Sequence, residues 1–179
     1  KIYSSRIHYL IAATNYETGL IDYFSNKNHD DIFEAMRASM AMPLLYNKII
    51  TIGGKKYCDS YASSSVEPGM LKAIELGANK LIVIDNCNHN GFGDLFFYLW
   101  LLARTRKFRS NYPGSGRINL KIPKNVQVIL IKPKNKLKIS RLNNDKEILR
   151  ETIECGFNET LQNKNLMTWL WSINADKNR

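Results

Sequence analysis

The sequence of 179 residues lacks an apolar run long enough to cross a bilayer. The longest run covers residues 96–103 and is bounded by Asp94 and Arg104. A spanning helix needs about 20 apolar residues, so we expect no transmembrane helix. The chain also begins without an initiator Met and without an apolar leader. We therefore expect no signal peptide and expect these residues to be part of a longer protein.

Cysteine is scarce, with only Cys58, Cys87 and Cys155. An odd number of cysteines without short repeated spacings does not make a disulfide framework, so we expect reduced thiols and a cytoplasmic protein. Cys87 and His89 lie close together, but the other cysteine and histidine residues are scattered singly. A structural zinc site needs about four ligands in closely spaced pairs. We therefore expect no metal, and nothing in the sequence implies a cofactor.

Acidic residues are absent between Asp94 and Asp145, a stretch of fifty residues. The stretch carries twelve positive charges: Arg104, Arg106, Lys107, Arg109, Arg117, Lys121, Lys124, Lys132, Lys134, Lys136, Lys138 and Arg141. Because the net charge of the chain is +10, the whole excess belongs to this basic stretch, Arg104 to Arg141. It predicts a polyanionic partner, either a membrane surface or nucleic acid. A solvated basic face that only keeps the protein soluble is the alternative.

Strand-like and helix-like patterns alternate along the chain. Strands are expected at 7–14, 48–52, 56–59, 80–85 and 126–131, with Gly53-Gly54 as a two-residue hairpin turn. Helices are expected from 31 to 43, 68 to 77, 95 to 104, 145 to 156 and 157 to 171. Asp31 with Glu34 resembles a capping box at the start of the first helix, and Asn144 or Asp145 is expected to cap the fourth. Ile32, Met36 and Met40 recur at helical spacing in the first of them. The alternation predicts one α/β domain with a mostly parallel sheet and helices on both faces.

Motifs for nucleophilic catalysis are incomplete. The nucleophile elbow G-x-S-x-G does not occur, and Gly114-Ser115-Gly116 lacks the context of a phosphate-binding loop. Asp59 stands out because it follows a hairpin strand and precedes a small polar run, 60–65. A carboxylate held there by rigid neighbours yet reachable has what a general base needs. An Asp before Ser is also a common turn-former, so the two interpretations stay open.

Four motifs in order resemble the patatin-like phospholipase family. They are A-T-N-Y-E-T-G at 13–19, A-M-R-A-S-M-A-M-P at 35–43, G-K-K-Y-C-D at 54–59 and A-I-E-L-G-A at 73–78. The resemblance runs from about Ile7 to Gly156. It implies an incomplete patatin-like fold, related to the α/β-hydrolases, in which residues 1–179 form the C-terminal portion of the domain.

The resemblance implies a lipid acyl hydrolase that uses a Ser-Asp dyad. Asp59 matches the Asp of the hairpin motif, whereas the serine elbow and the oxyanion loop would precede the first matching strand. The family has glycine after this Asp, but here Ser60 and Tyr61 follow. Their side chains are expected to narrow or reshape the site, because glycine permits positive φ and close backbone approach.

The leading interpretation is therefore an enzyme part that acts on acyl esters, peripheral to a membrane whose anionic lipids attract the basic stretch. In this interpretation the partners are a lipid substrate and an anionic membrane surface, with no nucleic acid. The alternative is a non-catalytic binding module that uses the same stretch on a membrane, on nucleic acid or on a protein.

Overall fold

The computed structural model describes residues 1–43, 45–46, 48–60, 66–85, 99–111, 121–135, 137 and 144–177, with side chains as far as residue 170. The chain divides into two compact units. The first unit contains residues 1–71 and 92–121, and the second contains residues 72–91 and 122–179.

A four-stranded antiparallel sheet forms the centre of the first unit. Its strands are β1 (Leu10–Asn15), β2 (Ile21–Ser25), β3 (Ile50–Ile52) and β4 (Lys55–Asp59), in the order β2-β1-β4-β3. Every neighbouring pair in this sheet is antiparallel. The prediction of a mostly parallel sheet with helices on both faces is therefore wrong for the described part of the chain.

Short connections explain two of the three antiparallel pairs, β1–β2 and β3–β4. Gly53 and Gly54 join β3 to β4 with φ of 56° and 77°, which confirms the predicted two-residue hairpin. A turn after Asn15 joins β1 to β2, and β2 was not among the predicted strands. Connections of so few residues can only reverse the chain, whereas parallel neighbours need a long crossover.

Helix α1 (Ile32–Ser39) covers one face of this sheet. Asp31 caps it, because its carboxylate accepts a hydrogen bond from the Glu34 N–H at 3.0 Å, as the sequence predicted. The spacing of Ile32, Met36 and Met40 correctly indicated a helix, but the helix buries Ile32, Ala35 and Ala38, whereas Met36 and Met40 are exposed. The core on this face consists of Ala13, Phe24, Ala35, Ala38, Ala41, Ile50 and Tyr57.

A second cluster in this unit joins Cys58 to Trp100 and Phe108. Trp100 belongs to a helical turn at 99–102, and Phe108 belongs to α4 (Arg106–Asn111), which was not predicted. The Nδ2 atom of Asn111 donates to the Thr18 carbonyl at 2.9 Å, so the end of α4 is tied to the β1–β2 turn. The remaining predicted helical residues, 95–98, lie outside the described residues.

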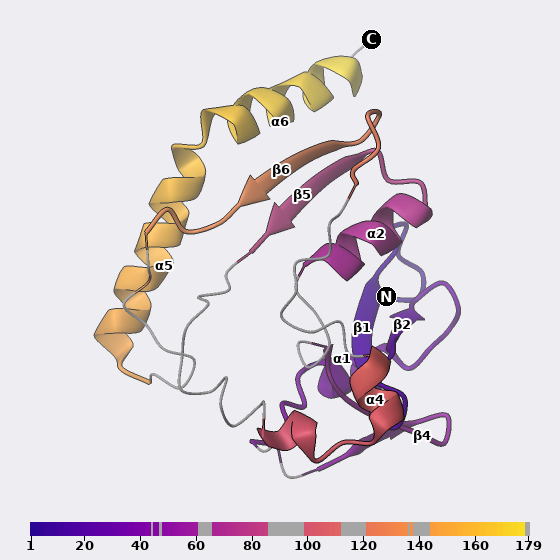
Figure 1. Ribbon diagram of the computed structural model, residues 1–179. Coiled ribbons are helices and arrows are strands. Elements are labelled where there is room, and N and C mark those ends of the chain that lie inside the picture. The colour runs from indigo at the N-terminus through magenta and orange to yellow at the C-terminus, as the bar shows by residue number, and fades with distance from the viewer. Residues whose placement is uncertain are drawn as a thin grey trace. The chain divides into compact units, whose positions relative to one another are not determined.

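The second unit contains the parallel strands β5 (Lys80–Ile84) and β6 (Gln127–Ile131) and the helices α5 (Lys146–Leu161) and α6 (Lys164–Lys177). Helix α2 (Glu67–Glu75) leads into it and is followed by Gly77 at φ 92°. In Figure 1, α6 lies next to β6, and the Trp169 Nε1 atom donates to the Gln127 side chain at 3.1 Å.

Two expectations about this unit need correction. Helix α5 begins after the predicted cap Asp145, but it continues through Gly156 to Leu161, and the last helix begins only at Lys164. Glycine inside a helix costs about 1 kcal/mol relative to alanine, and the neighbouring helical turns can offset this cost.

None of the helices in the described ranges is long and apolar enough to cross a membrane.

Candidate functional site

Asp59 is the last residue of β4, and Ser60 after it contacts the end of α1. Its register partner on β1 is Ala13, one residue before Thr14. Asp59 is partly exposed, although the preceding Tyr57 and Cys58 are buried. The structure therefore places Asp59 at the point where the strand leaves the buried core.

Two hydrogen bonds hold the main chain of Asp59. Its N–H donates to the Ala41 carbonyl at 3.0 Å, and its carbonyl accepts from the Thr14 hydroxyl at 3.0 Å. Thr14 is fully buried, so its bond to Asp59 is shielded from water. Ala41, Thr14 and Asp59 belong to three different motifs of the sequence, and these bonds bring the three motifs together.

Two hydroxyl groups lie beside this position. The Oγ atoms of Ser39 and Ser60 are 3.5 Å apart, so the residue after Asp59 contacts the end of α1. Among the described residues, His29 is the one non-glycine residue with positive φ. Ser60 therefore adopts a backbone conformation open to any residue, and this position does not require glycine. Tyr61, the second departure from the family pattern, lies outside the described residues.

Buried polar groups next to Asp59 have shifted pKa values. The pKa of the Cys58 thiol is raised from 9.0 to about 12, chiefly by burial and then by the charge of Asp59, while Arg104 opposes the shift. Burial and the hydrogen bond that the hydroxyl of Tyr57 donates to Asp22 raise the pKa of Tyr57 to about 12. Cys58 and Tyr57 are thus neutral near pH 7, and neither is a nucleophile there.

The A-T-N-Y-E-T-G motif has a local structural role. The Asn15 side-chain oxygen accepts hydrogen bonds from the N–H groups of Glu17 and Thr18 at 3.1 and 3.0 Å. Gly19 follows at φ 74°, and a Cβ atom there would lie 2.6 Å from the Phe108 carbonyl oxygen. The motif therefore forms the β1–β2 turn, and Gly19 allows α4 to pack closely against that turn. The sequence pattern did not indicate this packing.

Arg104 is held between two aromatic rings, another feature that the sequence did not indicate. Its guanidinium lies 4.8 Å from the ring centre of Tyr16 and 4.9 Å from that of Trp100. Such stacking attracts a cation to the ring faces and is worth about 1 kcal/mol or more. Arg104, the first charge of the basic stretch, thus serves the packing of residues 99–111 and is less available to a partner.

The rest of the basic stretch is divided between the two units. Arg106, Lys107 and Arg109 are exposed on α4 in the first unit, and Lys124, Lys132 and Lys134 are exposed in the second. Arg117, Lys136, Lys138 and Arg141 lie outside the described residues, and so do Cys87, His89 and Gly114–Gly116. In the part of the chain that the structure describes, no three His, Cys, Asp or Glu side chains group closely enough to hold a metal. Cys58 and Cys155 are free thiols.

No protein-family model matches this chain, and a search of curated proteins also found no match.

Proposed function

We propose that this chain is the Asp-bearing part of a patatin-like lipid acyl hydrolase that works in the cytoplasm at a membrane surface. Asp59 takes the proton of a serine outside these 179 residues, and the serine then attacks an acyl ester. Water clears the acyl-enzyme in a second step. The family assignment in this proposal rests on the four ordered motifs of the sequence.

The observation that carries the proposal is the convergence of three motifs on Asp59. Thr14, Ala41 and Asp59 are joined through the two 3.0 Å hydrogen bonds to the main chain of Asp59. A general base works only when it is held within hydrogen-bond reach of the proton that it removes. A backbone fixed on both sides contributes to that constraint, and Asp59 is a partly exposed residue.

Exposed cations on α4 support the membrane part of the proposal. Phe108 anchors the helix in the core, and Arg106, Lys107 and Arg109 remain exposed around it. Leu99 and Leu102 are also exposed in the neighbouring helical turn. Cations beside exposed leucines suit an interface with anionic lipid, because lipid headgroups attract the charges and the acyl boundary accepts the leucines.

The test is Asp59→Asn in a protein that contains both these residues and the serine. We expect hydrolysis of a nitrophenyl acyl ester to fall at least about a hundredfold, since a positioned base contributes about that much or more. Asp31→Asn is the matched control, because Asn caps a helix as well as Asp does. That control should keep the wild-type rate, and wild-type turnover by a folded Asp59→Asn protein would remove Asp59 from the mechanism.

A second arm of the same test uses a fluorophosphonate that labels activated serines. The 179 residues alone should stay unlabelled, because a base without a serine elbow and an oxyanion site activates no nucleophile. Labelling of the isolated chain at Ser39 or Ser60 would place the nucleophile inside it and contradict the proposed dyad.

A further inference from the structure

A pocket in the second unit lies between the end of β6 and the corner where α5 meets α6. Its volume is about 400 Å³, which is within the range of pockets that hold small ligands. It is lined by Leu130, Ile131, Lys132, Lys134, Glu159, Gln162, Asn163, Lys164 and Asn165. All nine residues belong to one compact unit, and none of them belongs to the site around Asp59.

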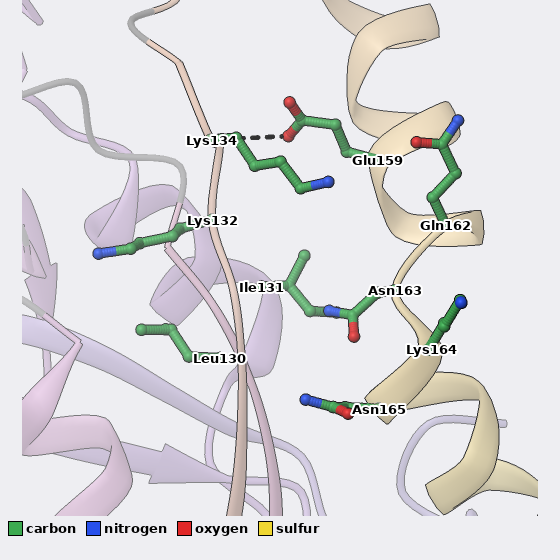
Figure 2. A pocket seen from close by; sticks show the side chains of 9 residues that line it. All are labelled: Leu130, Ile131, Lys132, Lys134, Glu159, Gln162, Asn163, Lys164 and Asn165. Carbon is green, nitrogen blue, oxygen red and sulfur yellow. Dashed lines mark hydrogen bonds between the residues drawn. The ribbon is translucent and has the colours of Figure 1, made fainter.

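Hydrogen bonds fix the walls of this pocket. The Lys134 N–H donates to the Glu159 carboxylate at 3.2 Å, which ties the segment after β6 to α5, as Figure 2 shows. The Asn163 side-chain oxygen accepts from the Leu166 N–H at 3.1 Å at the start of α6, and Leu166 is buried. The bond to Glu159 thus holds α5 beside the segment after β6, and the bond from Trp169 to Gln127 holds α6 beside β6.

Positive charge exceeds negative charge in the lining. Three lysines stand against Glu159, and within the described residues none of the three forms an ion pair. In Figure 2 the Lys134 side chain extends from the strand toward the α5–α6 corner, whereas Lys132 extends to the other side of the strand. Lys134 therefore points toward the corner, Lys164 lies at the edge of the pocket where α6 begins, and Lys132 adds a longer-range field.

The other polar groups around the opening are amides. Gln162, Asn163 and Asn165 each carry an NH₂ group that donates hydrogen bonds, and the Asn163 oxygen is already engaged by α6. Lysine ammonium groups bind phosphate oxygens as point charges, and amide donors add direction. Leu130 and Ile131 are the apolar residues of the described lining.

We propose that this pocket is a binding site for a phosphomonoester or diphosphate group, held by Lys134 and Lys164 with amide donors from the α5–α6 corner. The group belongs either to a soluble phosphorylated compound or to a lipid headgroup, since both present the same oxygens. The site is independent of the proposed hydrolase, so its failure would leave the role of Asp59 untouched.

The test is a titration of the isotope-labelled chain with pyrophosphate, followed by nuclear magnetic resonance at constant ionic strength. We expect saturable shifts at the amides of Lys134, Lys164 and Asn165. The double variant Lys134→Gln/Lys164→Gln should weaken binding at least about tenfold, because two charges contact the ligand. The matched control is Lys80→Gln/Lys124→Gln, which removes the same charge near the opposite ends of β5 and β6. That control should bind within about twofold of wild type.

Two results would overturn the proposal. Shifts that rise without saturation would mean a general response to anions, and equal weakening by both double variants would mean that only net charge matters. Vesicles with phosphatidic acid or with phosphatidylserine then identify the source of the phosphate. Competition with pyrophosphate by phosphatidic acid alone supports a lipid headgroup, and no competition by either vesicle supports a soluble ligand.

Discussion

Two hydrogen bonds hold the main chain of Asp59. The two bonds to Ala41 and Thr14 use its backbone N–H and carbonyl, so they survive a change of its side chain. Asp59→Asn should therefore change chemistry with little effect on folding. Folding should be more sensitive to a change at Thr14, which is fully buried. Removal of its hydroxyl would leave the Asp59 carbonyl without that hydrogen bond.

The two described free thiols should react at very different rates. Cys58 is buried with a pKa raised to about 12, whereas Cys155 is exposed on α5. A pKa that moves from 9.0 to about 12 lowers the thiolate fraction near pH 8 by about a thousandfold. We expect iodoacetamide at pH 8 to modify Cys155 at least about a hundredfold faster than Cys58, as peptide mass spectrometry can measure.

The modification rate of Cys58 should increase with pH. Because burial raises the Cys58 pKa, the modification rate of Cys58 should keep rising with pH up to about 12. In concentrated urea both thiols should react alike, since the burial is lost. Comparable rates in the folded protein at pH 8 would mean that Cys58 is not enclosed by Trp100 and Phe108.

At the scale of elements, the β1–β2 turn and α4 depend on each other through Gly19. A Cβ atom at Gly19 would lie 2.6 Å from the Phe108 carbonyl oxygen, and the residue has φ 74°. Gly19→Ala therefore adds a clash to the strain of a positive φ, which alone costs about 1 kcal/mol. We expect a loss in the free energy of unfolding of at least about 2 kcal/mol, measured by urea titration.

The variant Gly54→Ala separates the cost of the clash from the cost of a positive φ. Gly54 has φ 77°, close to that of Gly19, but its Cβ position has no atom within 4 Å. It should cost only the conformational strain, at least about 1 kcal/mol less than Gly19→Ala. Equal losses for the two variants would show that α4 does not pack closely on the turn.

At the scale of the whole molecule, the net charge of +10 is spread over both units, with exposed cations on α4 and around β6. Replacement of Arg106, Lys107 and Arg109 by Gln should lower binding to anionic vesicles at least about tenfold, since each cation near the surface is worth about 1 kcal/mol. Co-sedimentation near 0.1 M salt measures this, and binding should weaken as salt rises.

Replacement of Lys48, Lys55 and Lys56 by Gln provides the control. It removes the same charge from the β3–β4 hairpin region of the same unit. It should weaken binding less than the α4 variant. Equal weakening of vesicle binding by the two triple variants would mean that the attraction depends only on net charge. Binding to neutral vesicles as strong as to anionic ones would contradict the electrostatic origin, and much tighter binding to DNA would favour the alternative binding module.

Local signals were the part of the structure that the sequence determined. The caps Asp31 and Asp145, the Gly53-Gly54 hairpin and the position of Asp59 at a strand end were all confirmed. Each depends on hydrogen bonds or dihedral angles within a few residues, which neighbouring residues alone decide. The basic stretch could also be found from the sequence, because charge needs no fold to be counted.

Strand direction, helix faces and long-range pairs were decided only by the tertiary structure. Strands alternating with helices suggested a parallel sheet, but β1 and β4 pair antiparallel, although α1 lies between them in the sequence. Ala35 and Ala38 displaced Met36 and Met40 from the core because the helix packs closely on the sheet. Arg104 stacks on Tyr16, 88 positions away in the chain. Such contacts depend on which surfaces meet once the chain has folded, and local propensity carries no information about that choice.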